Sequence, residues 1–139
     1  MIILVDTNIV LDVLLNREPY ATEAQMIMTK CANREIAGYL AAHSIPNLFY
    51  ILRKAYSPKE RRRLIRNLCY IFHISELNEK KIISAAENEE FLDFEDCLQE
   101  ECAMEAMADY IVTRNPNDYV NSRVKVIEPK EFVTLLKAE

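Results

Sequence analysis

Glycine is nearly absent from this chain, and its scarcity removes whole classes of nucleotide-binding protein. Among 139 residues the only glycine is Gly38. Walker-type loops and dinucleotide-binding turns both need several glycines within a few residues, because the backbone must approach the phosphates closely. The sequence therefore excludes enzymes that hold a nucleotide in a glycine-rich cradle.

Histidine is also scarce, and the cysteines are not paired in sequence. The two histidines, His43 and His73, have no neighbouring partner at metal-binding spacing, and the four cysteines form no C-x-x-C pair. Structural zinc sites are built from such closely spaced ligands. We therefore expect no zinc site, and we expect reduced, mostly buried cysteines in a cytoplasmic protein.

Long apolar runs are missing as well. The most apolar stretch covers residues 1–15, but Asp6 and Asp12 interrupt it and no basic residue precedes it. A membrane span needs about 20 apolar residues, and a signal peptide needs a basic start. We expect neither in this chain.

The length and composition that remain indicate one soluble domain. The chain has 139 residues, of which 50% are hydrophobic and 28% are charged. A domain typically has roughly 150 residues, and a chain of this size buries enough surface to fold without disulfides or a structural metal. We predict a single domain over residues 1–139.

Charge is segregated along the chain, although the net charge is only −5. Residues 53–66 hold seven basic residues and one acid, whereas residues 82–113 hold ten acids and no Lys or Arg. A basic strip beside a carboxylate cluster fits a polyanion held against bound cations. Each block is equally well explained as the solvated face of a helix, so both interpretations stay open.

Short apolar strands alternate with helical patterns, which predicts a parallel sheet covered by helices. The first strand, Ile2–Val5, is apolar throughout, as expected of a central strand that is buried on both faces. The other predicted strands are Ile36–Ala41, Tyr70–Ile74, Tyr110–Thr113 and Val124–Ile127. The sequence thus predicts a mainly parallel sheet of about five strands.

Helix signals lie between these strands. The predicted helices cover Asn8–Leu15, Thr22–Asn33, a segment opened by Pro46, a segment opened by residues 57–60, a segment capped by Asn78, Phe94–Met107 and a terminal segment from Pro129. Residues 57–60, Ser-Pro-Lys-Glu, have the form of a capping box with proline at the first helical position. We expect the helix that they open to carry the basic strip, including Arg61, Arg62 and Arg63, on its polar face.

Polar residues follow two of the predicted strands. Asp6 ends the first strand, and residues 113–118 follow the fourth. Ligands of open parallel sheets bind at the carboxyl ends of the strands, where loops and helix N-termini converge. An aspartate there either caps the next helix or binds a cation, and the sequence leaves both open for Asp6.

A second group of carboxylates lies on the helix predicted over Phe94–Met107. Asp93, Asp96 and Glu100 are spaced i, i+3 and i+7, which places them along one side of the helix. Capping explains an acid at the helix start but not Glu100 in the middle. A solvated acidic face is an equally good explanation. If the group binds metal, oxygen ligands without histidine or thiolate select Mg²⁺ or Mn²⁺.

These motifs together resemble one known family. Residues 3–12, ILVDTNIVLD, are similar to the first strand and loop of PIN domains. D-F-E-D at 93–96 and T-R-N-x-x-D at 113–118 resemble the later acidic motifs of that family, in the same order. The resemblance spans nearly the whole chain and points to the small prokaryotic ribonucleases of the VapC-like toxin type. It implies an α/β/α sandwich and Mg²⁺- or Mn²⁺-dependent hydrolysis of RNA.

The resemblance also implies roles for individual residues. The acids that correspond to the metal-binding and catalytic carboxylates are Asp6, Asp96 and Asp118. The residues that correspond to polar supports are Thr7, Asn8 and Asn115. A toxin of this type is expected to pair with an antitoxin protein and to form a homodimer, and Arg61, Arg62 and Arg63 are expected to bind RNA phosphates.

One position departs from the pattern of the family. The helix after the second strand usually brings a glutamate into the ring of acids, and Asn47 stands at the corresponding place. An amide oxygen can bind Mg²⁺ but adds no charge, so affinity for a second cation should fall unless Asp93 or Glu100 compensates. Without compensation, the alternative is a catalytically weak PIN-like module that binds RNA or a protein partner.

Overall fold

The computed structural model of the protein describes residues 1–139 and contains one sheet of five parallel strands. The strands are β1 (Ile2–Val5), β2 (Ala37–Ala41), β3 (His73–Ser75), β4 (Tyr110–Val112) and β5 (Val126–Ile127). Their order across the sheet is β3-β2-β1-β4-β5, with β1 in the centre. The central position explains the unbroken apolar run of β1, because both faces of this strand are covered.

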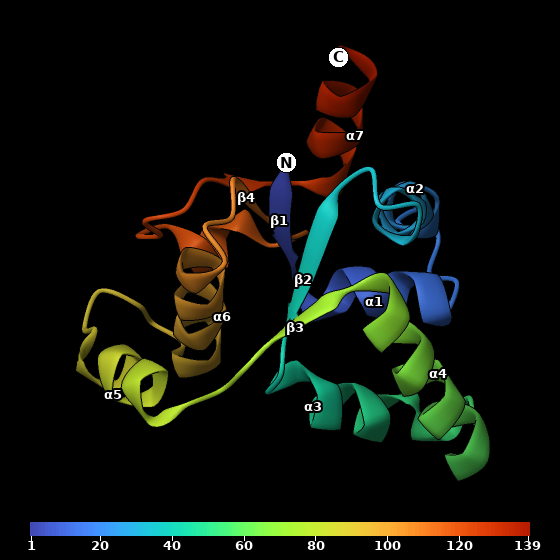
Figure 1. Ribbon diagram of the computed structural model, residues 1–139, viewed down its shortest axis with the longest axis horizontal. Coiled ribbons are helices and arrows are strands. Elements are labelled where there is room, and N and C mark those ends of the chain that lie inside the picture. The colour runs from blue at the N-terminus through green and yellow to red at the C-terminus, as the bar shows by residue number, and fades with distance from the viewer.

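Seven α-helices flank the sheet (Figure 1). They are α1 (Thr7–Leu14), α2 (Ala21–Ala32), α3 (Ser44–Ile51), α4 (Pro58–Ile71), α5 (Glu79–Glu87), α6 (Phe94–Glu105) and α7 (Pro129–Lys137), with 3₁₀ turns η1 (Leu52–Lys54) and η2 (Pro116–Tyr119). In Figure 1, α1, α2, α4 and α7 lie on one side of the sheet and α5 and α6 on the other. The predicted α/β/α sandwich is therefore confirmed. None of these helices combines the length and apolar character needed to cross a membrane.

Side chains that alternate along β1 build the core on both faces of the sheet. Ile3 and Val5 belong to the larger core cluster, together with Ile27 of α2. Leu4 faces the other side and packs in a second cluster that includes Cys102 of α6. This alternation fixes β1 between two layers of helices, so its carboxyl end is held at a defined place.

The helix-start signals at Ser57 and Asn78 act as the sequence predicts, whereas the helix predicted to open at Pro46 begins two residues earlier. The Ser57 hydroxyl accepts a hydrogen bond from the Glu60 backbone N–H, and the Glu60 carboxylate accepts one from the Ser57 backbone N–H. Asn78 caps α5 by accepting from the backbone N–H of Lys81. Helix α3 begins at Ser44, two residues before Pro46, so Pro46 lies in its first turn.

The third strand lies later than the sequence indicates. Strand is predicted over Tyr70–Ile74, but α4 continues to Ile71 and β3 begins at His73. Leu64, Leu68 and Ile71 recur at helical spacing and pack against the larger core cluster. The prediction is wrong for the first half of this segment, because its apolar residues continue the buried face of the helix instead of starting a strand.

The single glycine is required by a close approach between β2 and its covering helices. A Cβ atom on Gly38 would lie 2.5 Å from the Sγ of Cys31 and 2.9 Å from Cδ1 of Phe72. Both neighbours are buried, so neither can swing into solvent. A larger residue at position 38 must displace part of the core.

We therefore predict that Gly38→Ala lowers the free energy of unfolding by about 2 kcal/mol, because the added methyl group overpacks the core. Urea denaturation followed by circular dichroism measures this change. The double variant Gly38→Ala, Cys31→Ala should lose less stability than the sum of the single variants, since the smaller side chain frees space. An unchanged unfolding midpoint in Gly38→Ala would contradict the prediction.

Candidate functional site

Asp6 lies at the carboxyl end of β1 and is only 9% exposed. It occupies the N-cap position of α1, but its side chain makes no capping hydrogen bond. Its Oδ2 instead accepts a hydrogen bond of 2.7 Å from the hydroxyl of Thr113. The sequence leaves open whether Asp6 caps α1 or binds a cation, and in this structure its side chain does not cap the helix.

Thr113 is the residue that holds Asp6, and sequence reasoning gives it no role. β1 and β4 pair in parallel with Val5 opposite Val112, so the residues that follow the two strands are neighbours. Thr113 is fully buried, and its Oγ1 accepts a hydrogen bond of 3.0 Å from the backbone N–H of Asn115. The adjacency of β1 and β4 is the signal that identifies Thr113, and the order of the strands cannot be read from local sequence.

Asp6, Asp96 and Asp118 come from three separate segments and lie close enough for the charge of Asp118 to act on the other two carboxyl groups, although Asp118 does not line the cavity beside them. Asp96 lies in the first turn of α6 and Asp118 in η2. Burial is the main cause that raises the pKa of Asp6, and the charge of Asp118 raises it further. Burial, followed by the charges of Asp93, Asp6 and Asp118, raises the pKa of Asp96 to about 7. These carboxyl groups thus interact with one another through unfavourable like charges.

A cavity of about 130 Å³ opens beside Asp6 and Asp96. The polar residues Thr7, Asn8 and Asn47, which the sequence nominates as supports, all line it. Thr7 and Asn8 belong to the first turn of α1, and Asn47 belongs to α3. In Figure 1, α1 and α3 both begin at the end of the sheet where β1 and β2 finish. The cavity therefore lies where a parallel sheet is expected to bind ligands.

The chemistry of these donors fits a hard divalent cation. Carboxylate and amide oxygens are the ligands that Mg²⁺ and Mn²⁺ prefer, and a cation would favour the charged forms of Asp6 and Asp96, whose pKa values are raised first by burial and then by neighbouring negative charges. The side chains do not form a closed ligand cage, since no group of three or more His, Cys, Asp or Glu residues is arranged to hold a metal ion. The site is an open acidic cleft.

Neither Asp93 nor Glu100 lines the cavity with Asp96, although Asp93 lies close enough to raise the pKa of Asp96. The Oδ1 of Asp93 caps α6 by accepting from the backbone N–H of Asp96. Glu100 is fully buried, and both its oxygens accept hydrogen bonds from Arg123. A carboxylate buried this deeply needs a paired positive charge, which Arg123 supplies. Glu100 does not line the acidic cavity. Its compensation for Asn47 is not supported by this geometry.

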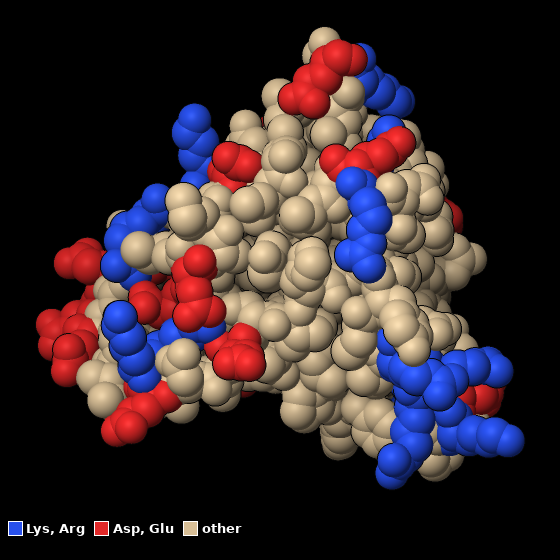
Figure 2. Space-filling model, in the orientation of Figure 1, with Lys and Arg blue, Asp and Glu red and all other residues tan.

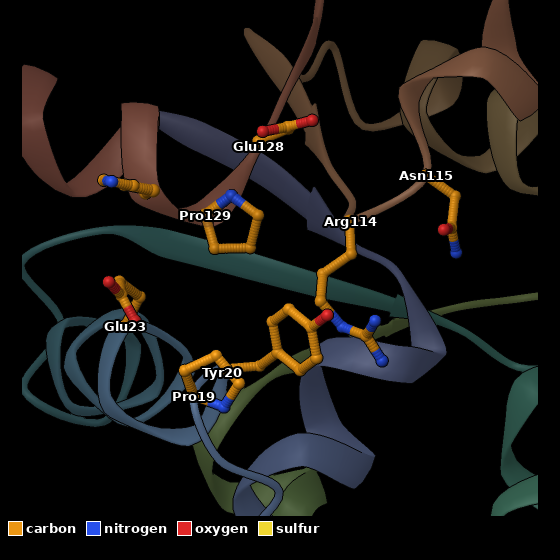
Figure 3. Close-up of a pocket in the computed structure, with 8 residues that line it drawn as sticks. Pro19, Tyr20, Glu23, Arg114, Asn115, Glu128 and Pro129 are labelled. Atoms are coloured by element: carbon orange, nitrogen blue, oxygen red, sulfur yellow. The ribbon is translucent and has the colours of Figure 1, made fainter.

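Arg114 and Asn115 border a different hollow of about 440 Å³, lined also by Tyr20, Glu23 and Glu128 (Figure 3). The Arg114 guanidinium lies 4.0 Å from the centroid of the Tyr20 ring. Its Nε and Nη2 donate to the carboxylate of the fully buried Asp12, at 2.6 Å and 3.2 Å. The side chain of Asn115 therefore does not line the acidic cavity, and the contribution of Asn115 to the site is its backbone N–H on Thr113.

Several residues that line the cavity are absent from the sequence-based candidates: the neutral polar residues Ser44 and Gln99, and also His43 and the acidic residue Glu95. Gln99 of α6 is 4% exposed, and its Nε2 donates a hydrogen bond of 3.1 Å to the hydroxyl of Ser44. His43 lies beside Ser44 and lines the same cavity. Helical spacing could have identified Gln99, because it stands three residues after Asp96 and so shares its face of α6.

The basic strip forms a dense patch on α4, at the lower right of Figure 2. Arg62 and Arg63 are exposed. Arg61 is not free, because its Nη1 donates to the carbonyl of Phe49 at 2.8 Å and its guanidinium lies 4.2 Å from the centroid of the Phe49 ring. The expectation that all three arginines are available for a ligand is therefore corrected: Arg61 fastens α4 to α3.

Comparison with known proteins gives one family and a set of similar folds. Residues 2–117 match the sequence profile of the family described as PIN domain. No curated protein sequence matches the chain. The VapBC2 complex of Rickettsia felis bound to promoter DNA has 14% sequence identity and a TM-score of 0.66, covering 92% of this chain and 98% of that chain.

Two further solved structures share the fold. A toxin–antitoxin complex from Klebsiella pneumoniae has 20% identity and a TM-score of 0.66, covering 91% of this chain and 96% of that chain. FitAcB from Neisseria gonorrhoeae has 18% identity and a TM-score of 0.67, covering 92% and 98%. At these identities the similarity establishes the α/β/α fold.

The raised pKa of Asp96 generates a prediction about stability without metal. The folded protein retains the Asp96 proton up to about pH 7, whereas the unfolded chain releases it near the ordinary value of 3.8. The contribution of Asp96 to stability therefore falls as the pH rises through this interval. In EDTA at pH 8, Asp96→Asn should be more stable than the wild type by about 1 kcal/mol, a value discounted because the carboxyl group is partly exposed.

Thermal unfolding at pH 4 and pH 8 measures this effect, and the difference between the two proteins should shrink at pH 4. The matched control is Asp118→Asn, in which the pKa of Asp96 is measured by carboxyl NMR. This pKa should fall, because the variant removes one of the repelling charges. Equal stabilities at pH 8 together with an Asp96 pKa near 4 would contradict the proposed repulsion.

Proposed function

Because this chain belongs to the PIN domain family, we propose that it is a Mg²⁺- or Mn²⁺-dependent endoribonuclease that hydrolyses phosphodiester bonds in RNA. The observation that supports the proposal is a cavity lined by Asp6 and Asp96 whose pKa values are raised, first by burial and then by neighbouring acids that include Asp118. Clustered carboxylates can bind a divalent cation, and the bound cation can in turn bind the oxygens of a phosphate.

Asp6, Asp96 and Asp118 would hold the cation, with Asn47 offering an amide oxygen. When bound, the cation lowers the pKa of a water molecule and neutralises charge on the phosphoryl oxygens. The bond from Thr113 fixes the orientation of the Asp6 carboxylate, and the Tyr119 hydroxyl lies 3.4 Å from Oδ1 of Asp96. These contacts hold the two carboxylates in place while substrate binds.

No protein nucleophile is required, and none of the four cysteines, including the exposed Cys69, lines the acidic cavity. Cys31, Cys97 and Cys102 are buried, and burial is the first cause that raises the pKa of each thiol. A thiol with a raised pKa is a poor nucleophile, because the thiolate is the reactive form. Water is therefore the attacking group in the proposed reaction.

We assign the protein to the toxins of toxin–antitoxin pairs. Structures with the same fold are described as toxin–antitoxin complexes, which supports an antitoxin protein as partner. A segment of that partner would cover the acidic cleft, and a homodimer would present two such clefts. The RNA substrate and the four free cysteines are consistent with a cytoplasmic location.

A second candidate function is favoured by Asn47. With an amide in place of an acid and no closed ligand cage, the cleft carries less negative charge than a ring of four acids would. The chain would then be a catalytically weak module that binds RNA or a protein partner. Metal-dependent cleavage distinguishes this candidate from the nuclease.

The decisive measurement is cleavage of structured and unstructured RNA by the pure protein over a titration of Mn²⁺. We expect metal-dependent cleavage by the wild type and a loss of at least about 100-fold in Asp6→Asn, because removing one anionic ligand lowers cation binding and transition-state stabilisation. Asn47→Glu should tighten Mn²⁺ binding and raise cleavage most at low metal concentration.

Absence of cleavage by all three proteins, with RNA binding retained, would reject the nuclease in favour of the binding module. Residual cleavage of equal rate in Asp6→Asn would instead indicate a contaminating nuclease. Calorimetry of Mn²⁺ binding separates a weak metal site from an inactive one, since it does not depend on turnover.

The exposed arginines of α4 generate a prediction about affinity. Arg62→Ala, Arg63→Ala should weaken RNA binding and reduce the slope of log K against log salt by about 1, because each phosphate contact contributes roughly 0.7 on a single strand. Turnover at saturating RNA should survive, since the patch lies on α4 and not in the acidic cleft. The control is Lys80→Ala, Lys137→Ala, which removes the same charge from exposed sites on α5 and α7. Equal slopes for the two double variants would show that the α4 patch is only a solvated face.

A further inference from the structure

The neutral wall of the acidic cavity contains a buried side chain with unused hydrogen-bonding capacity. Gln99 is 4% exposed, and one end of its amide is bonded to Ser44. The other end, Oε1, is buried and has no hydrogen-bond partner. Burying an amide atom without a partner is unfavourable, so such atoms in a folded protein are commonly completed by a bound group.

His43 adds two more unpartnered atoms at the same place. Both its Nδ1 and its Nε2 are buried without a hydrogen-bond partner, and the ring lies near Glu95 of α6, which lines the same cavity. His43, Ser44 and Gln99 all line the cavity that also contains Asp6 and Asp96. Three unpaired polar atoms from two elements, the β2–α3 connection and α6, therefore lie next to a single cavity.

The cavity is suited to a hydroxyl-bearing group and not to a stacked base. Its volume of about 130 Å³ holds several water molecules, and only Leu11 and Ile51 in its lining are hydrophobic. No Phe, Tyr or Trp lines it, so it offers none of those rings as a platform for a base. The available atoms instead match the donor and acceptor character of a sugar hydroxyl.

We propose that Gln99, with His43 and Asn47, binds the ribose 2′-hydroxyl next to the scissile phosphate and so selects RNA over DNA. The proposal rests on the proposed nuclease function. The 2′-hydroxyl is attached to the carbon beside the one that bears the 3′-oxygen, so a phosphate at Asp6 and Asp96 brings this hydroxyl to the neighbouring wall. Recognition of the 2′-hydroxyl is the means by which a protein distinguishes RNA from DNA at a given site.

The test compares two fluorescein-labelled 12-nucleotide pools of random sequence, one of RNA and one of DNA. Binding is measured by fluorescence anisotropy with Ca²⁺ in place of Mn²⁺, and gels verify that the strands stay intact. We expect the wild type to bind the RNA pool about tenfold more tightly than the DNA pool, as one or two hydrogen bonds can provide. Gln99→Met, which is nearly isosteric but cannot pair, should reduce the preference to about twofold by weakening RNA binding alone.

Two further variants keep the test decisive if Gln99→Met fails to fold. Asn47→Ala changes an exposed residue of the same cavity and should also reduce the ratio of RNA affinity to DNA affinity, whereas the loss of a cation ligand alone would weaken both pools equally. Gln25→Met, at the only other glutamine of the chain, is exposed on α2 and should leave the preference at its wild-type value.

Equal binding of the two pools by the wild type, or a full RNA preference in folded Gln99→Met or Asn47→Ala, would overturn the proposal. Its failure is distinguishable from failure of the nuclease. If Gln99 variants lose an RNA preference but Mn²⁺ supports no cleavage by the wild type, the ribose site stands and the nuclease falls. If the wild type cleaves RNA but Gln99→Met retains the preference, the nuclease stands and the ribose site falls.

Discussion

The hydrogen bond from Thr113 to Asp6 is the contact on which the rest of the cleft depends. It joins residues 107 positions apart, and it exists because β1 and β4 are adjacent in the sheet. The backbone N–H of Asn115 donates to Thr113, and the carbonyl of Asn115 accepts from the backbone N–H of Asp118. The position of Asp118 is thus tied to that of Asp6 through the turn that leaves β4.

The residues that line the cleft divide into a charged group and a neutral polar group. Asp6, Glu95 and Asp96 form the charged part, while Ser44, Asn47 and Gln99 form the neutral part. Helix α6 contributes to both, since Asp96 and Gln99 lie one turn apart. A phosphodiester has the same division, because the phosphate is charged and the adjoining sugar is neutral. The arrangement therefore offers matched surroundings to both halves of one nucleotide link.

Local sequence patterns could predict most of the fold and part of the site. The parallel sheet, the capping box at Ser57 and the acidic residues at the ends of β1 and β4 all follow from short-range signals. Strand order does not, so Thr113 could not be recognised as the partner of Asp6. The same limit applies to Glu100, whose spacing from Asp96 indicates a shared surface. Its partner Arg123 lies 23 residues away, and only the tertiary fold brings the two together.

The end of α4 shows a different limit. The residues around Ile71 are apolar and β-branched or aromatic, which is typical of a strand, yet they complete the face through which Leu68 packs into the core. Tertiary packing outweighs local propensity at this point.

The ion pair between Glu100 and Arg123 has a consequence for the geometry of catalysis. Arg123 belongs to the connection that leads into β5, the edge strand of the sheet, and it grips α6 one turn after Asp96. A helix that is clamped at one turn cannot rotate at the next, so the edge of the sheet sets the direction in which Asp96 faces. Arg123 does not line the cavity, yet it helps to set the orientation of a residue that does, so sequence changes at the edge of the sheet would alter the cleft without touching any residue that lines it.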